Sequence, residues 1–78
     1  MKPLRLNHYH WLESNPEIFG GKPIVKGTRL TASFILGCLA QGMSPEEIDQ
    51  TYTPFPHDAI PEIMKLSSEA LDQPDVAA

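Results

Sequence analysis

The spacing of apolar residues changes at Arg29, and this change divides the chain into a short extended part and a longer helical part. Before it, aromatic rings alternate with histidines within residues 7–12, and this two-residue period predicts a short strand with an aromatic inner face. Residues 24–26 predict a second strand, which we expect to pair antiparallel with the first. A two-stranded ribbon alone is barely stable in water, so it has to pack on helices or on another copy of the chain.

Beyond that point, apolar residues recur at the three- to four-residue spacing of a helix. We expect a first helix that begins after a cap at Thr31 or Ser33 and ends near residue 41, where Gly42 can stop it. Gly37 lies inside this helix and costs about 1 kcal/mol relative to alanine. Close packing by another backbone is the reason that we expect for this glycine.

The segment Ser44-Pro45-Glu46-Glu47 predicts the start of a second helix. Ser44 can accept a hydrogen bond from the amide of Glu47, the Glu47 carboxylate can reach back to the amide of Ser44, and proline suits the first helical position. The prolines within residues 53–57 end this helix, because a residue that precedes proline is pushed towards extended geometry.

A third helix is predicted from about Asp58 to Leu71, with His57 or Asp58 as its cap. Pro61 then lies in the first turn, where backbone amides have no partner within the helix. Carboxylates, which repel phosphates, are expected to dominate its outer face. That face comprises Asp58, Glu62, Lys65, Ser68, Glu69 and Asp72. We therefore prefer a solvated acidic face to a helix that reads the major groove of DNA.

These elements predict a mainly α domain in which three helices follow a short β-hairpin, an order that matches a helix-turn-helix arrangement. We expect a flexible N-terminus over residues 1–6, the hairpin over 7–30, the three-helix domain over 31–72 and a frayed tail over 73–78. A chain of 78 residues buries only about 60% of the surface that it exposes when unfolded. We therefore expect a partner to add stability, most simply in a homodimer.

The sequence also bears on the compartment. No apolar run approaches the roughly 18 residues of a membrane span, and the basic start of the chain lacks the apolar core of a secretory signal. The single cysteine, Cys38, excludes an internal disulfide and is typical of a reducing compartment. We therefore expect a cytoplasmic protein without membrane contact.

Charge is divided unevenly along the chain, whose net charge is −4. Residues 1–30 are net positive and residues 31–78 are strongly negative, so contact with nucleic-acid phosphates is expected from the first part. The candidate DNA-binding residues are Lys22, Lys26, Arg29 and Lys65. The alternative is that the lysines lie on a solvated ribbon edge and that Arg29 holds loop carbonyls or Glu17.

No constellation of residues predicts an active site or a metal site. His8 and His10 lack a third ligand at a recognisable spacing, so an exposed strand face is the better interpretation. Cys38 is expected to be a small buried hydrophobe, since no helix start or basic neighbour is present to activate it. His57 and Asp58 are adjacent, and adjacent residues seldom orient each other for catalysis. We therefore expect no catalytic residue, no cofactor and no small-molecule substrate.

Aromatic side chains carry much of the binding energy at protein interfaces. The candidate contacts with a partner or a second copy are Tyr9, Trp11, Phe19 and Phe55. The alternative is that these rings fill a small core, and we favour it for Trp11 and Phe55.

Residues 15–30, with the segments Gly20-Gly21-Lys22-Pro23 and Gly27-Thr28-Arg29, resemble the domain of unknown function 433 family. The similarity continues through residues 42–48 and residues 56–60 into the helix that follows, and it covers most of the chain.

The resemblance implies a homeodomain-like helix-turn-helix domain with a short β element ahead of it, and a prokaryotic antitoxin of the VapB-like kind. Such an antitoxin binds and silences a PIN-like nuclease toxin encoded beside it, and the pair can repress its own promoter by binding operator DNA. A toxin that handles RNA is expected to have a cationic cleft, which the acidic residues 46–75 would complement. Two alternatives stay open: a stand-alone DNA-binding transcription regulator and a structural dimerisation module.

Overall fold

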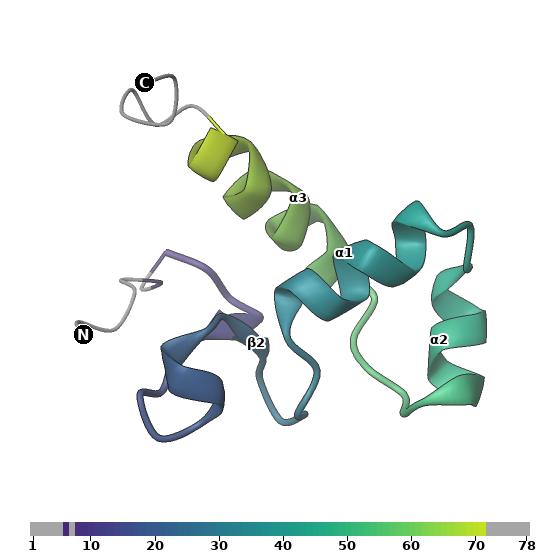
Figure 1. Cartoon of the computed structure of the whole chain (residues 1–78), viewed down its shortest axis with the longest axis horizontal. Helices are drawn as coiled ribbons and strands as arrows, with labels where there is room; N and C mark the ends of the chain where they lie inside the picture. Colours follow the sequence, from purple (N-terminus) through teal and green to yellow (C-terminus); the bar gives the residue numbers. More distant parts are fainter. Residues whose placement is uncertain (1–5, 7, 72–78) are drawn as a thin grey trace.

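A short antiparallel hairpin is followed by three helices in the computed structural model of the chain, which describes residue 6 and residues 8–71. Figure 1 shows α1 between the hairpin and α2, and α1 contacts both of the other helices while α3 contacts β1. The predicted fold class, mainly α with an N-terminal hairpin, is confirmed. The elements are β1 (Leu12–Glu13), the 3₁₀ turn η1 (Phe19–Gly21), β2 (Ile24–Val25), α1 (Ala32–Ala40), α2 (Pro45–Thr51) and α3 (Ala59–Leu71).

The hairpin is shorter than the sequence predicts. Leu12 pairs with Val25 and Glu13 with Ile24, and Ile24 also forms a bridge to Thr31 on its other side. The chain that leads into α1 therefore runs along β2 and widens the ribbon. This arrangement buries Leu12, Ile24 and Val25 almost completely.

The strand predicted over residues 7–12 is wrong except at its last residue. The Tyr9 amide donates a hydrogen bond to the Leu6 carbonyl at 2.9 Å, so the chain turns there instead of extending. The next two amides donate to a carboxylate of α3, which takes the place of a neighbouring strand. Residue 7 itself lies outside the described residues.

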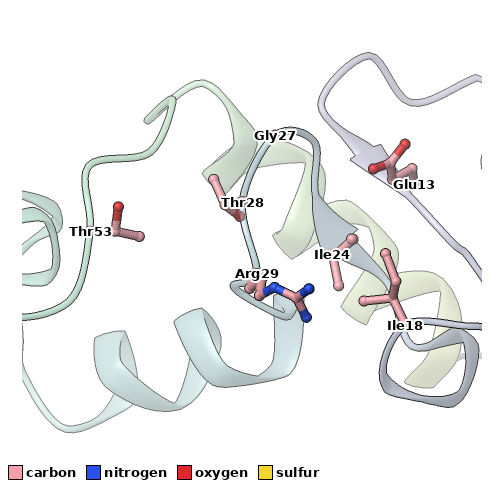
Figure 2. Close-up of a pocket in the computed structure, with 7 residues that line it drawn as sticks. All are labelled: Glu13, Ile18, Ile24, Gly27, Thr28, Arg29 and Thr53. Atoms are coloured by element: carbon pink, nitrogen blue, oxygen red, sulfur yellow. The ribbon is translucent and has the colours of Figure 1, made fainter.

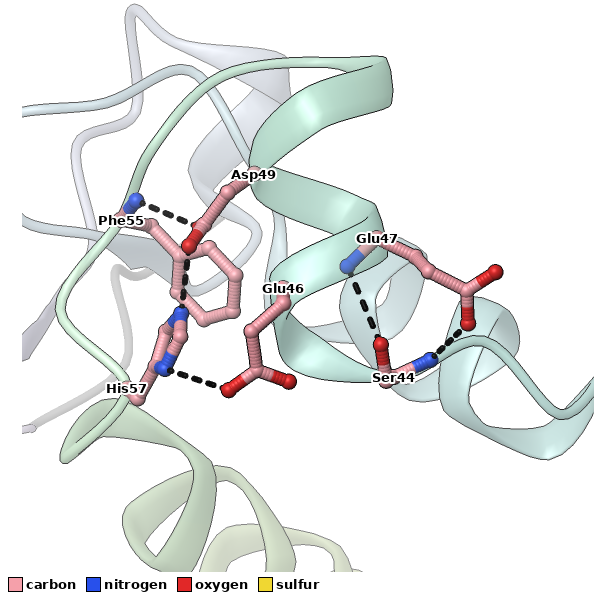
Figure 3. Close-up of polar contacts among 6 residues, drawn as sticks. All are labelled: Ser44, Glu46, Glu47, Asp49, Phe55 and His57. Atoms are coloured by element: carbon pink, nitrogen blue, oxygen red, sulfur yellow. Dashed lines mark hydrogen bonds and ion pairs between the residues drawn. The ribbon is translucent and has the colours of Figure 1, made fainter.

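The helix starts follow from local hydrogen bonds. The Thr31 hydroxyl accepts from the Phe34 amide at 3.0 Å and caps α1. At α2, the Ser44 hydroxyl accepts from the Glu47 amide at 3.1 Å and the Glu47 carboxylate accepts from the Ser44 amide at 2.8 Å (Figure 3), so the predicted capping box is confirmed. The third helix begins at Ala59, one residue after its predicted start.

Gly37 does not have the role that the sequence suggests within the chain. A Cβ atom added to it would meet no atom within 4 Å, so no other backbone of the same chain packs closely against α1 at this point. The predicted close packing is therefore wrong inside the described part of the chain. Gly42, by contrast, has φ +94 and ends the first helix as predicted.

The core is formed by the hairpin, the three helices and the loop before α3. Cys38 belongs to it as a small buried hydrophobe, as expected. Leu6, the only described residue of the N-terminus predicted to be flexible over 1–6, is also buried, whereas the tail predicted over 73–78 lies outside the described residues. The buried hydrophobic residues are Leu6, Tyr9, Leu12, Ile24, Val25, Leu30, Ala32, Ile35, Cys38, Ile48, Phe55, Ala59 and Ile63.

Among the described residues, no helix combines the length and the apolar character that crossing a bilayer requires.

Candidate binding surface

The turn between β2 and α1 is held by one side chain. The Thr28 hydroxyl donates to the Val25 carbonyl at 2.9 Å and accepts from the Leu30 amide at 3.0 Å. Gly27 provides the left-handed backbone that this turn needs, with φ +79. Because Thr28 ties both ends of the turn together, Arg29 is presented to solvent from a fixed backbone.

Arg29 is exposed, and within the described part of the chain its guanidinium makes no hydrogen bond and no ion pair. The expected contacts with Glu17 or with loop carbonyls are therefore not made. Its side chain extends towards Ile18 (Figure 2) along a hollow of about 540 Å³. This hollow is lined by Glu13, Ile18, Ile24, Gly27, Thr28, Arg29 and Thr53.

Arg29 also borders a second, more apolar hollow of about 240 Å³, lined by Phe19, Arg29, Leu30, Thr31, Phe34 and Tyr52. The rings of Phe34 and Tyr52 meet edge to face, with their centroids 4.8 Å apart. Phe19, Phe34 and Tyr52 are 48%, 38% and 52% exposed, and they are three of the five large hydrophobic side chains exposed on the described part of the chain. We call these three residues, with Arg29, the Phe19–Arg29 surface.

Phe19 has the least favourable backbone of this surface. Its φ is +50, and among the described residues it is the only non-glycine residue with a positive φ. A bulky side chain in the left-handed region costs about 1–2 kcal/mol. The ring is half exposed, so burial recovers only part of that cost. Strain that packing does not explain is typical of residues that bind something else.

Sequence reasoning identified Phe19 and Arg29 but missed Phe34 and Tyr52. Phe34 lies off the apolar stripe of α1, and that departure is the signal that could have found it. Tyr52 follows Ile48 at helical spacing, which favours a shared buried face, but α2 ends at Thr51, and Tyr52 is its C-cap with 52% of its surface exposed.

The other predicted contact residues divide between core and surface. Tyr9 and Phe55 are 4% and 7% exposed, so both rings fill the core, which is the alternative assignment. Trp11 is partly buried and packs against the core. Of the four aromatic candidates, Phe19 alone is about half exposed and available to a partner.

The predicted DNA-binding lysines lie on three different elements. Lys22 follows η1, Lys26 lies in the turn after β2 and Lys65 lies in the middle of α3, and all three are exposed. None of them pairs with a carboxylate within the described residues, where the two ion pairs both involve His57. Their charges therefore remain uncompensated.

The acidic outer face predicted for α3 is wrong at Glu62, which is partly buried, whereas Glu69 is exposed as predicted. Glu62 accepts hydrogen bonds from the amides of His10 and Trp11, each at 2.8 Å, and Glu69 accepts one from the Tyr9 hydroxyl. Both carboxylates thus hold the chain segment before β1. The exposed residues of α3 include Pro61, Met64, Lys65, Ser68, Glu69 and Leu71, whereas Asp72 lies outside the described residues.

The hydrogen bond between Tyr9 and Glu69 makes the stability of the fold depend on pH. Burial, followed by the hydrogen bond to Glu69 and the charges of Glu69 and Glu62, raises the pKa of Tyr9 from 10.0 to about 12. A raised pKa means that the folded state holds the phenolic proton more tightly, so the stability that it contributes is complete below pH 10 and is lost as the pH rises towards 12.

We expect the free energy of unfolding to fall more steeply between pH 10 and pH 12 in the wild type than in Tyr9→Phe. Urea titrations at several pH values measure the free energy of unfolding of both proteins. Parallel pH profiles for the two proteins would contradict this prediction, and Tyr52→Phe is the matched control, because its ring is half exposed.

A polar cluster joins the loop before α3 to α2 (Figure 3). The Asp49 carboxylate accepts from the Phe55 amide at 3.2 Å and hydrogen-bonds with His57 Nε2 at 2.7 Å, while His57 Nδ1 lies 3.9 Å from Glu46 Oε2. The partner of His57 is thus Asp49, one loop away, and not the adjacent Asp58. Among the described residues, no three His, Cys, Asp or Glu side chains are arranged to hold a metal ion.

The comparisons with known proteins bring one match. Residues 12–64, more than half of the chain, match the model of a family described as "Protein of unknown function (DUF433)". No curated protein and no solved structure matches significantly.

Proposed function

The chain belongs to the DUF433 family, and from this premise we propose that it is a non-enzymatic, antitoxin-like domain that binds and neutralises a PIN-like nuclease. The Phe19–Arg29 surface is the proposed contact. In this proposal α1, α2 and α3 act as a helix-turn-helix domain in the cytoplasm, and the protein represses its own operon as a secondary role.

The observation that carries the proposal is the exposed ring of Phe19 beside the unpaired Arg29. Aromatic and arginine side chains are the residue types that most often dominate binding energy in protein interfaces. Here the ring is held outward by a left-handed backbone, and the guanidinium leads from a turn fixed by Thr28. Preorganised groups of this kind lose little conformational entropy when a partner binds.

The charge of the helices supports a cationic partner. The carboxylates of Glu62 and Glu69 accept hydrogen bonds from neutral donors. Among the described residues, the acidic side chains of α2, Glu46, Glu47 and Asp49, form no ion pair with a lysine or an arginine. A nuclease with a cationic cleft for RNA would therefore be attracted to the acidic side chains of α2 and α3, which speeds association.

Co-expression with the PIN-like nuclease encoded beside it tests the proposal. We expect the wild-type chain to restore growth and to co-purify with the nuclease, and Phe19→Asn combined with Arg29→Ala to lose both. Asparagine tolerates a positive φ, so the fold is kept while the ring is removed.

The matched control is Met64→Asn combined with Lys65→Ala on α3, which removes an exposed apolar residue and a cation elsewhere and should leave neutralisation intact. Growth that the wild type does not restore, or equal loss in both double variants, would reject this function.

A second candidate function, binding of operator DNA, is favoured by the exposed and unpaired Lys22 and Lys26. The connection from α2 to α3, residues 52–58, is longer than the three- to four-residue turn of a DNA-binding helix-turn-helix. This length favours the hairpin lysines over α3 as the DNA contact. In the same strains, Lys22→Glu with Lys26→Glu should abolish retention on promoter DNA while nuclease binding persists. Unchanged retention would reject the DNA contact alone.

A further inference from the structure

No contact within the described residues explains why position 37, inside α1, is a glycine. It lies in the interior of α1, where glycine destabilises a helix relative to alanine. Its φ is not positive, and a Cβ atom there would meet nothing within 4 Å. Neither backbone geometry nor packing within the described residues therefore requires glycine at this position.

A hollow of about 330 Å³ lies over this glycine, and it is lined by Ser33, Phe34, Gly37, Cys38, Gln41 and Tyr52. Phe34 and Tyr52 also line the hollow beside Arg29, so their edge-to-face pair borders both hollows. We call this pair the Phe34–Tyr52 ridge. Two partly exposed aromatic rings thus adjoin a recess that has a glycine in its lining.

The hollow over Gly37 has no charged side chain in its lining. Residues 30–45 contain no Asp, Glu, Lys or Arg, although charged residues make up 21% of the chain. Two copies of a chain with net charge −4 repel each other, and the repulsion is smallest where the contacting faces are neutral. An uncharged face with two exposed rings is therefore suited to a second copy of this chain.

We propose that two copies associate through α1 about a two-fold axis, with the Phe34–Tyr52 ridge of each copy seated in the hollow over Gly37 of the other. A two-fold contact is self-complementary, so one face has to supply both the ridge and the recess. The missing side chain at Gly37 allows the partner ring to approach the helix backbone. Phe34 and Tyr52 also belong to the Phe19–Arg29 surface, so the second copy and the nuclease compete for this ridge, whereas Phe19 and Arg29 take no part in the dimer contact.

The size of the face sets the expected strength. The half-exposed rings of Phe34 and Tyr52 offer on the order of 100 Å² each, about a quarter of the roughly 800 Å² that each partner buries in a stable complex. The exposed residues Ser33, Ala40 and Gln41 add to that area. An interface at the small end of the range predicts a reversible dimer that forms at concentrations of about 10–100 µM.

Sedimentation equilibrium of the full chain tests the proposal. Gly37→Leu fills the hollow, and we expect it to weaken the monomer–dimer equilibrium by at least about tenfold, a change of about 1.4 kcal/mol. Tyr52→Ala, which removes half of the ridge, should have a similar effect. The matched control is Ser68→Leu, which adds the same exposed side chain to α3 and should leave the equilibrium unchanged.

Gly37→Ala should change monomer stability and self-association in opposite directions. At concentrations where the protein is monomeric, alanine should raise Tm by about 4–8 °C, because it stabilises the helix and meets no atom. The same methyl group lies between the two copies in the dimer and should weaken association. A higher Tm together with weaker self-association is the result that we expect.

Three outcomes would overturn the proposal: a wild-type chain that stays monomeric up to about 1 mM, an equilibrium that Gly37→Leu leaves unchanged, or equal weakening by Ser68→Leu. Each is independent of nuclease binding, since the variants at Phe19 and Arg29 should still form dimers if the nuclease proposal fails.

Discussion

Replacing Phe55 by alanine is expected to destabilise the fold by about 3–5 kcal/mol, which is most of the stability of a small domain. Phe55 is 7% exposed and lies in the core with Ile48 and Ile63, so its removal leaves a cavity among side chains that cannot fully close it. Urea denaturation followed by the fluorescence of Trp11, the single tryptophan, measures the loss.

Phe19→Ala is the matched control, because it removes the same ring from a half-exposed position. We expect its effect on unfolding to stay within about 0.5 kcal/mol, as is usual for surface substitutions. Equal destabilisation by the two variants would mean that Phe55 does not belong to the core. The hypothesis that Phe55 contacts a partner or a second copy would then be preferred.

Glu62→Ala should cost about 2–3 kcal/mol and should release the segment before β1 from α3. The carboxylate accepts hydrogen bonds from the amides of His10 and Trp11, each at 2.8 Å, and hydrogen bonds to charged groups contribute about 1.5–3 kcal/mol. Hydrogen exchange should therefore accelerate most at the Trp11 amide, which is partly buried and would lose its acceptor.

The control for this variant is Glu17→Ala, since the Glu17 carboxylate accepts no hydrogen bond among the described residues and the variant should unfold like the wild type. Glu62→Gln retains one acceptor oxygen and should fall between the two. Unchanged protection of the Trp11 amide in Glu62→Ala would show that packing, and not this carboxylate, holds the segment.

The helices could be predicted from the sequence because the interactions that start them are local. Thr31 caps the amide of Phe34, and Ser44 and Glu47 cap each other, all over three residues of sequence. Such pairs are recognisable in any chain without knowledge of the tertiary structure. The β2 strand and the glycine stop at Gly42 were predictable for the same reason.

The candidate surface and the first strand were harder to predict, because they depend on contacts across the chain. Glu62 was placed on a solvated face, whereas it binds amides more than fifty residues earlier, and this pairing displaces the predicted strand. No short-range pattern encodes it. Phe34 and Tyr52 come together only after α1 and α2 pack, so the hollows on either side of them have no signature in the sequence.

The hydrogen bonds that Glu62 and Glu69 accept from the segment before β1 also determine the order in which the native contacts can form. During translation, residues 8–11 leave the ribosome well before α3, and their acceptors do not yet exist. The capped helices α1 and α2 can form early from local contacts, while closing the long loop to α3 carries a larger entropic cost. The segment before β1 can therefore reach its native contacts only after Glu69 has been synthesised. In a nascent chain stalled before that point, residues 8–11 should remain accessible to proteases.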